Sequence, residues 1–489
     1  MARTVEARTA SATDGSEDPR RWWVLVAMVF GLFMPVLDNL VVNVALPTIQ
    51  HKLGAQLSGL QWIVDAYTLT FASFMLTGGA LGDLYGRKRF FMGGLGLFTL
   101  GSLMCGLSAS TGQLVAFRAV QGLGAAMLLP GSLSIITSTF SGKERGAAIG
   151  IIGLIMTATI VRESKDPSRS RRLDPPGLIT GTAGLFFLVY ALIEGNAKGW
   201  TNSLILGSFA LAAVILAAFF TIESRRESPM LPLRFFRIPT FAAANVVAAA
   251  VFFAMFGSVF FLSLYLQNVR GYSPVAAGVR LFAFSVVILF IAPLSGRLSD
   301  RFGSRWFMTF GPLLAAGGLG LLLRTDPTSA YASVLLPAFI VLAAGMAMTM
   351  SPMTAAVMGS VDVQHAGVAS AATNTSREVG GVFGIALLGA IVTAAFKRDF
   401  LARLVAGGMT STQAHGIVTA AGNAAATGGT TATGIATGPV SEAIKQSFVH
   451  AMHVGILVAI VFMAIAGVVS AIFVRSHVTA HGETFEAGD

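Results

Sequence analysis

The chain has 489 residues, of which 54% are hydrophobic and only 11% are charged. Soluble domains carry about a quarter charged residues, so this composition excludes an ordinary soluble protein and predicts a polytopic membrane protein. The net charge of +10 is explained by the excess of lysine and arginine that membrane proteins keep on their cytoplasmic side, and it gives no reason to expect a nucleic-acid partner.

In chain order, the polar segment 1–21 is expected to be a cytoplasmic tail, and the apolar run 22–45 is the first span. That run is too long for the core of a signal peptide, and no small-residue cleavage site follows it. Eleven more apolar runs lie near 59–82, 90–109, 112–136, 176–194, 203–222, 240–266, 275–296, 306–323, 332–358, 378–396 and 450–474. They are far longer than the strands of about 10 residues in membrane β-barrels, so the sequence predicts an all-α protein with about 12 spanning helices.

Three ionisable residues fall at bilayer depth: Asp38 in the first span, Asp65 in the second and Arg118 in the fourth. Burying each costs roughly 2.5–3.5 kcal/mol on insertion scales, which makes all three functional candidates. A rise of 1.5 Å per residue places Asp38 about 24 Å into its helix and the other two roughly 9 Å inside the outer ends of theirs, so one shared layer is expected. Two carboxylates meet one guanidinium, so one carboxylate, for which Asp38 is the first choice, is expected to lack a full partner and to exchange protons. The alternative is a static ion-pair cluster that fixes helix packing. The same layer could also bind a cationic substrate, which is compatible with proton exchange.

A motif at the cytoplasmic end of the second span, 79–88, occurs again 217 residues later at 296–305, after another span. Both copies read Gly-x-Leu-x-Asp-x-x-Gly. An acidic residue at the C-terminal end of a helix is unfavourable unless it meets an arginine or another helix N-terminus, so each copy is expected to form a breakable cytoplasmic latch. The candidate gating residues are Gly79, Asp83, Gly86, Arg87 and Lys88 in the first copy and Gly296, Asp300, Arg301 and Gly303 in the second. The repeat indicates an internal duplication, which is typical of transporters whose halves rock against each other.

The apolar segment 147–161 is too short to be a span, because fifteen residues reach only about 22 Å across a hydrocarbon core of about 30 Å. Lys143 and Arg145 precede it, and five more lysines and arginines lie within 162–172. If the segment stays in the cytoplasmic interface, the basic residues on both sides of it are cytoplasmic. The positive-inside rule favours this arrangement. We therefore expect a non-spanning segment, either interfacial or re-entrant, and cytoplasmic termini.

The segment 397–449 is predicted to be the only long loop, on the external side. Its part 405–438 is rich in Gly, Ala and Thr, which predicts a flexible tether, and 441–450 is expected to be a short amphipathic lead-in to the last span. The preceding span begins at Arg377 and Glu378, which are expected to pair with each other.

The chain resembles the drug:proton antiporters of the major facilitator superfamily, in the branch with fourteen helices. The segments that carry the resemblance are 37–47 for the first-helix motif, 61–67 for the second helix, 79–88 for the loop motif and 114–124 for the fourth-helix motif. The resemblance implies a transporter of two helix bundles, a role in proton coupling for Arg118, and two extra helices, 176–194 and 203–222, between the bundles.

One departure from the family concerns the Gly-Pro…Gly-Gly motif of the fifth helix, which marks antiporters and is absent here. Segment 145–151 resembles the start of the fifth helix and 156–167 the end of the sixth, as though the two were fused or partly deleted. The expected organisation is a tail 1–21, an incomplete N-terminal bundle 22–172, linker helices with a cytoplasmic loop 173–239, a C-terminal bundle 240–475 that includes the external loop 397–449, and a tail 476–489.

The sequence contains no P-loop, no nucleophile motif and no zinc-ligand spacing, so neither ATP hydrolysis, an enzyme, a cofactor nor a metal is expected. The resemblance implies a monomer in the plasma (inner) membrane that exports lipophilic or cationic small molecules in exchange for protons. Asp38 is the expected protonation site, Arg118 tunes it and Asp65 completes the polar layer. Two alternatives stay open: a transport-impaired derivative that inserts in the membrane, and a proton-linked uptake permease, which the missing antiporter motif favours. The substrate and the residues that bind it are not predicted.

Overall fold

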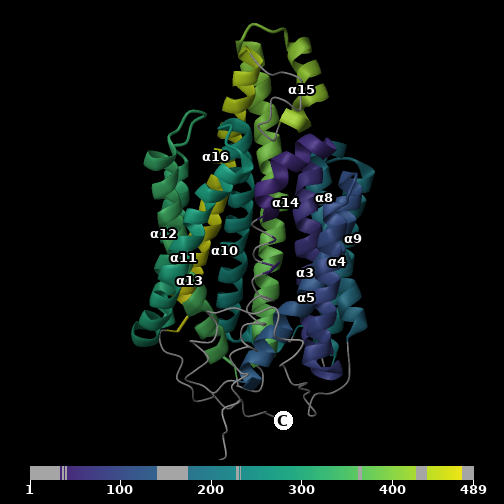
Figure 1. Cartoon of the computed structure of the whole chain (residues 1–489), viewed down its shortest axis with the longest axis vertical. Helices are drawn as coiled ribbons and strands as arrows, with labels where there is room; N and C mark the ends of the chain where they lie inside the picture. Colours follow the sequence, from purple (N-terminus) through teal and green to yellow (C-terminus); the bar gives the residue numbers. More distant parts are fainter. Residues whose placement is uncertain are drawn as a thin grey trace, which may run out of the picture.

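A computed structural model describes residues 34, 35, 38, 41–139, 174–226, 229, 231, 233–361, 366–425 and 438–475. Figure 1 shows an all-helical arrangement of the described chain. A helix covers 41–53. The other elements are α3 (Leu57–Tyr85), α4 (Arg87–Gly106), α5 (Thr111–Thr139), α8 (Pro175–Lys198), α9 (Ser203–Arg225), the 3₁₀ helix η2 (Leu233–Arg237), α10 (Pro239–Leu264) with the π-helical turn η3 (Tyr265–Val269), α11 (Pro274–Phe302), α12 (Ser304–Leu322), the π-helical turn η4 (Tyr331–Leu335) with α13 (Leu336–Gly359), α14 (Ala366–Ala406), α15 (Ser411–Ala425) and α16 (Pro439–Phe473).

Several helices begin where the sequence supplies a capping side chain. Asp174 accepts a hydrogen bond from the backbone N–H of Gly177 at the start of α8, and Ser273 accepts one from Ala276 at the start of α11. A proline occupies the first turn in both helices, where its missing N–H would have had no partner. These caps fix the helix starts outside the long apolar runs.

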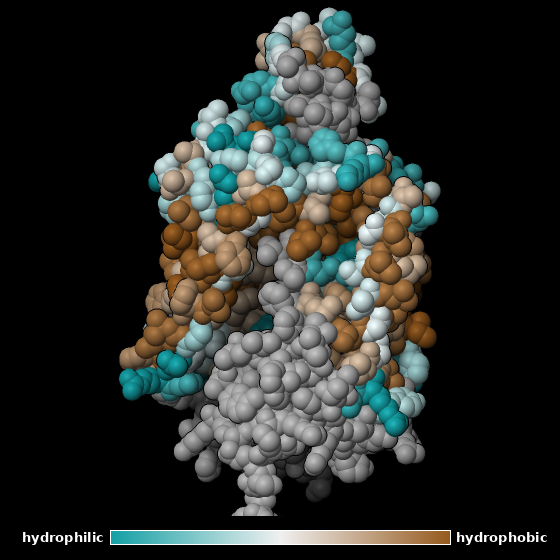
Figure 2. Space-filling model, viewed as in Figure 1, coloured by the Kyte–Doolittle hydropathy of each residue, from teal (hydrophilic) through white to brown (hydrophobic). Residues whose placement is uncertain are grey.

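The prediction of about 12 spanning helices is confirmed. Eight described helices are long and apolar enough to cross a membrane: α4, α8, α9, α10 with η3, α11, α13 with η4, α14 and α16. α3, α5 and α12 have 19 to 29 residues and match three more predicted spans, and the helix 41–53 lies at the end of the first. Figure 2 shows a broad belt of hydrophobic side chains with hydrophilic ones above and below it, as expected for a chain that lies in a bilayer.

The helices form two groups that meet along α14. α3, α4 and α5 pack against one another and α8 packs on α9, while α10, α14 and α16 pack together and α12 packs on α13 and α16 (Figure 1). α14 belongs to the second group because it packs on α10 and α16, and it also contacts α3 and α8 of the first group.

The two groups are joined by hydrogen bonds at the end of the molecule where α3 begins, which we call the tied end. The bonds run from Gln61 Nε2 to the Ile385 carbonyl (2.9 Å), from Asn196 Nδ2 to the Ala390 carbonyl (2.7 Å), from Gln267 Nε2 to the Val44 carbonyl (2.8 Å) and from Ser263 Oγ to the Asn43 carbonyl. Because side-chain amides and hydroxyls at bilayer depth have few other partners, such bonds hold helices in register.

The loop predicted for 397–449 is wrong where α14 and α15 form, whereas the lead-in predicted for 441–450 is helical, as part of α16. α14 continues through 397–406, α15 occupies Ser411–Ala425, and α16 begins at Pro439 and runs without a break into the last span. At 1.5 Å per residue, the 41 residues of α14 reach about 61 Å and the 35 of α16 about 52 Å, well beyond a hydrocarbon core of about 30 Å. Both helices therefore project from the membrane and, with α15, form the lobe at the top of Figure 1.

The predictions for the segment 147–161 and for the terminal tails fall outside the described residues. The same holds for the expected fusion of the fifth and sixth helices, which lies within 140–173.

Candidate functional site

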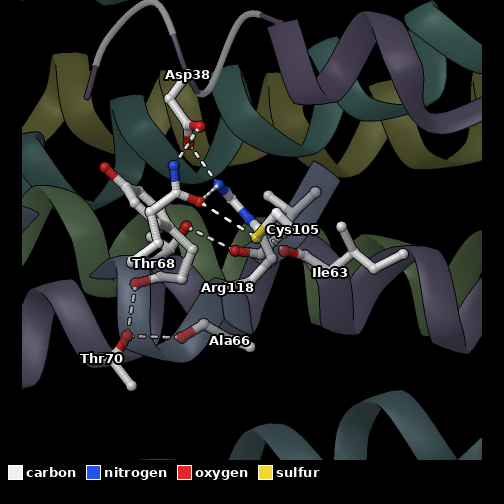
Figure 3. A network of polar contacts seen from close by, with 10 residues as sticks. Asp38, Ile63, Ala66, Thr68, Thr70, Cys105 and Arg118 are labelled. Atoms are coloured by element: carbon white, nitrogen blue, oxygen red, sulfur yellow. Dashed lines mark hydrogen bonds and ion pairs between the residues drawn. The ribbon is translucent and has the colours of Figure 1, made fainter. Parts of the chain in front are cut away.

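The centre of the site is an ion pair between Asp38, on the first helix, and Arg118, on α5. Arg118 Nη1 donates to Asp38 Oδ2. Gln121, one helical turn after Arg118, bridges the pair: its Oε1 accepts from Arg118 Nη1 (2.8 Å) and its Nε2 donates to Asp38 Oδ1 (2.8 Å). Figure 3 shows the Asp38 and Arg118 side chains converging, with the Cys105 thiol of α4 beside them. The Cys105 sulfur lies 3.7 Å from Gln121 Oε1.

Arg118 is held in the protein interior by α3. Its side chain is only 1% exposed, its Nε donates to the Ile63 carbonyl (3.0 Å), and its guanidinium carbon lies 4.2 Å from the centre of the Tyr67 ring. A backbone carbonyl in a helix can accept this extra bond because oxygen has two lone pairs, and the ring face attracts the cation. α3 therefore fixes the direction in which the guanidinium points.

Among the described residues, Asp65 is a carboxylate without a hydrogen-bond partner. It is fully buried on α3, and neither of its oxygens has a hydrogen-bond partner among the described residues. The sequence analysis favoured Asp38 as the less compensated acid, and the contacts reverse this choice. The reason is geometric: Arg118 reaches Asp38 with Gln121 beside it, while Asp65 lies two residues along α3 from the carbonyl that holds Arg118.

Two more buried polar atoms have no hydrogen-bond partner in the described part of the chain: Tyr67 Oη and Arg118 Nη2. Leaving a buried polar atom unsatisfied costs about 1–3 kcal/mol. These atoms and the Asp65 carboxylate can therefore bind a proton, a water molecule or a polar group of a substrate with little competition from the protein itself.

Arg377 and Glu378 do not form the local pair that the sequence analysis expected. Arg377 Nη1 donates to Asn374 Oδ1 (3.1 Å) and Nη2 to Thr354 Oγ1 (3.0 Å). Glu378 Oε2 is buried and has no hydrogen-bond partner within the described ranges. Glu378, on α14, is thus a second carboxylate with an oxygen that no described residue satisfies.

The two loop motifs adopt the same backbone geometry. Gly86 (φ 107°) precedes α4 and Gly303 (φ 84°) precedes α12, and each connects its helix to the one before it with a backbone conformation that favours glycine. Gly79 and Asp83 lie in the last two turns of α3, and Arg87 and Lys88 begin α4.

In the second copy, Gly296, Asp300 and Arg301 lie in the last turns of α11, and the Asp300 side chain is exposed. The shared geometry agrees with an internal duplication. The side chains of Asp83 and Arg87 are outside the described part, so the latch remains a proposal.

Two residues of the site were not singled out from the sequence. Gln121 was missed because a glutamine carries no charge and is unremarkable in a span, although its position three residues after Arg118 places it on the same helix face. Tyr67 was missed because aromatic residues are common in membrane helices, and only the packing of α3 on α5 brings its ring to the guanidinium.

Comparisons with known proteins bear on what this arrangement does. The family model described as Major Facilitator Superfamily matches residues 28–162 and 164–385. The chain is 35% identical over 408 residues to the multidrug resistance protein Stp of Mycobacterium tuberculosis, covering 76% of this chain and 75% of that protein. It is 30% identical over 496 residues to the tetracenomycin C resistance and export protein of Streptomyces glaucescens, covering 93% and 92%.

The fold also has a counterpart among solved structures. A bacterial homologue of the human lysosomal transporter Spinster, in an inward-facing and occupied conformation, superposes with a TM-score of 0.64 at 19% identity, covering 96% of this chain and all of that one. At this identity the likeness concerns the fold alone.

Proposed function

This chain belongs to the Major Facilitator Superfamily, and from that membership we propose that it exports lipophilic or cationic small molecules in exchange for protons. The family consists of membrane transporters, and two relatives carry names of multidrug resistance and of antibiotic resistance and export. The single observation that carries the proton coupling is the ion pair of buried Arg118 with partly buried Asp38, together with the Asp65 carboxylate, which has no hydrogen-bond partner among the described residues.

We assign the exchanged proton to Asp65. Protonating Asp38 would leave the Arg118 charge unpaired in the interior, whereas Asp65 can gain a proton without breaking any described contact. Neutral Asp65 is tolerated in a buried position, but charged Asp65 needs a cation or a polar group nearby. A proton and a cationic substrate therefore compete for the same carboxylate, and this mutual exclusion is what exchange requires.

We further propose that the protein lies in the plasma membrane as a monomer, with both termini in the cytoplasm and the tied end outside. The loop motifs then face the cytoplasm, where their basic residues satisfy the positive-inside rule. The proton gradient supplies the energy, without a cofactor.

The test uses purified chain in liposomes that contain a trapped pH-sensitive dye. Tetraphenylphosphonium is added outside, and the internal pH is followed. Exchange makes the internal pH rise, because protons leave as the cation enters. A fall in internal pH identifies a symporter, and no change in pH identifies a transport-impaired chain, so either result rejects the proposed exchange.

Asp65→Asn is the matched variant for the coupling residue. It should reduce the pH response by at least about tenfold, because the amide cannot carry a proton, while Asp65→Glu should retain part of it. An undiminished response in Asp65→Asn would move the coupling to another group, with Asp38→Asn as the next variant to measure.

A further inference from the structure

A cavity of about 490 Å³ lies between α3, α5 and α8, and neither Asp38 nor Arg118 is among its lining residues. α3 lines it with residues one turn apart, including Trp62, Ala66 and Thr70, while Asp65 and Tyr67 are not among its lining residues. Its volume is in the range of small-molecule sites, which are mostly apolar with a few polar groups. We call it the α8 cavity, and it is distinct from the ion-pair site.

One wall of the α8 cavity consists of three aromatic rings. The centre of the Trp62 ring lies 5.8 Å from that of Phe186 and 6.3 Å from that of Tyr190, and the Phe186 and Tyr190 centres are 6.2 Å apart. Phe186 is 41% exposed, so the wall reaches the surface of the protein. Aromatic rings grouped in this way attract organic cations through their negative faces and pack well on flat or chain-like apolar groups.

A carboxylate lies at the end of this wall. Glu194, one turn after Tyr190 on α8, lines the cavity, and its Oε1 accepts a hydrogen bond from Trp62 Nε1 (3.2 Å). The indole N–H thereby fixes the carboxylate next to the rings. A carboxylate has about four acceptor positions, so Glu194 can accept further donors.

The contacts of Lys198 show which chemical group this corner accepts. Its ammonium lies 3.5 Å from Glu194 Oε2, donates to the Tyr190 hydroxyl and lies 4.9 Å from the centre of the Tyr190 ring. The Lys198 side chain is 39% exposed, so it makes these contacts from the edge and can leave them. An ammonium group is therefore already bound by a carboxylate, a phenol and a ring face.

We propose that the α8 cavity binds an amphipathic cation, with its ammonium group replacing that of Lys198 beside Glu194 and its apolar part lying along Trp62, Phe186 and Tyr190. The ligand is either a free amphipathic amine or a lipid with an ammonium headgroup, since both present the same chemistry. This site is independent of whether the chain exchanges protons.

Trp62 provides a reporter inside the site. The chain has five tryptophans, and replacing all but Trp62 with phenylalanine leaves one fluorophore in the cavity. The protein is placed in phosphatidylglycerol nanodiscs and titrated with 12-bromododecylammonium, whose bromine quenches tryptophan at short range. The neutral 12-bromododecanol is the matched ligand control. A chain that keeps only Trp306, which is exposed on α12, measures non-specific partitioning into the lipid.

The preference for the cation is the ratio of the alcohol concentration to the cation concentration at half-maximal quenching. This preference should be at least about tenfold higher at Trp62 than at Trp306. Glu194→Gln should remove this preference, and Lys198→Met should strengthen it, because the competing ammonium is gone. These opposite effects distinguish binding from a structural disturbance, which would weaken quenching in both variants. Equal preference at Trp62 and Trp306, or an unchanged preference in Glu194→Gln, would overturn the proposal.

The source of the ligand is resolved by a second set of nanodiscs that contain phosphatidylethanolamine. If a lipid headgroup occupies the site, this lipid raises the concentration of the cation needed for half-maximal quenching of Trp62. If it has no effect, the natural ligand is a free amphipathic amine. Both results presuppose the preference at Trp62 that defines the site.

Discussion

At the scale of single residues, the contacts of Arg118 distinguish two acids that composition alone treats alike. Arg118 is paired with Asp38, and no described contact joins it to Asp65. Removing one partner of a buried ion pair leaves the other charge uncompensated, at a cost of about 3–5 kcal/mol, whereas removing both avoids most of that cost.

Two double-mutant cycles test this pairing through the thermal stability of the purified protein. In the cycle of Asp38→Asn and Arg118→Gln, the double variant should be less destabilised than the sum of the single variants by about 1–3 kcal/mol. In the matched cycle of Asp65→Asn and Arg118→Gln, the effects should add within about 0.5 kcal/mol. Coupling in the second cycle and additivity in the first would assign the guanidinium to Asp65 instead.

The sequence was sufficient to find the charged residues of the site but not to pair them. Asp38, Asp65 and Arg118 were identified because charge at bilayer depth is expensive, a rule that needs no neighbours. The choice between the two acids depends on which face of α5 meets the first helix and which meets α3. Helical periodicity groups residues on a face without saying what that face contacts, so Gln121 and Tyr67 became visible only in the packed structure.

At the scale of helices, the close approach of α3 and α5 depends on Gly122. A Cβ atom built on Gly122 would collide with the Tyr67 carbonyl and with Thr70 Oγ1, both on α3. Small residues allow membrane helices to approach until their backbones touch, and this contact is also what brings the Tyr67 ring over Arg118.

Gly122→Ala should therefore lower the melting temperature and disturb the site, since the backbone of α3 cannot move away cheaply. Gly96→Ala in α4 is the matched control, because nothing lies within 4 Å of its added methyl group. The control should be neutral or stabilising by up to about 1 kcal/mol, as alanine is the better helix former. Equal melting temperatures for the two variants would contradict the close contact at Gly122.

The helices themselves were predictable wherever apolar runs are long, and the errors lie outside the membrane. Segment 405–438 was taken as a tether because it is rich in Gly, Ala and Thr. Alanine is nevertheless the strongest helix former, and α15 forms in part of this segment. α14 continues beyond its apolar run through polar residues, where Arg403 pairs with Asp399 one turn before it. Hydropathy cannot mark the end of such a helix, because leaving the bilayer does not end its backbone hydrogen bonds.

At the scale of the whole molecule, the hydrogen bonds of the tied end hold the two helix groups together on one side. Gln61 and Asn196 each donate a side-chain amide to a carbonyl of α14. For the groups to rock apart at this end, those bonds must break. Each contributes about 1 kcal/mol, so together they shift the balance between closed and open arrangements by about tenfold or more.

Thiol labelling measures this balance in a Cys105→Ser background, which removes the only native cysteine. Thr393 is buried beside Gln61 and Asn196, so Thr393→Cys should react slowly with an impermeant reagent added to intact cells. Adding Gln61→Ala and Asn196→Ala should increase that rate about tenfold.

Ser411→Cys on the exposed start of α15 is the control for this experiment. It should label from outside at the same rate in both backgrounds. If Ser411→Cys is protected in intact cells, the proposed orientation is wrong. If Thr393→Cys keeps its rate when the two amides are removed, these bonds do not hold the end closed.

The length of α14 has a mechanical consequence. A helix of about 61 Å that contacts both groups can act as a lever about its midpoint. If the helix tilts by about 10° about its midpoint, its far tip sweeps about 5 Å, and α15 is carried with it. A protein that binds α15 and the first helix group at the same time would then restrict the tilt of α14. It would do so without contacting the ion pair or the α8 cavity.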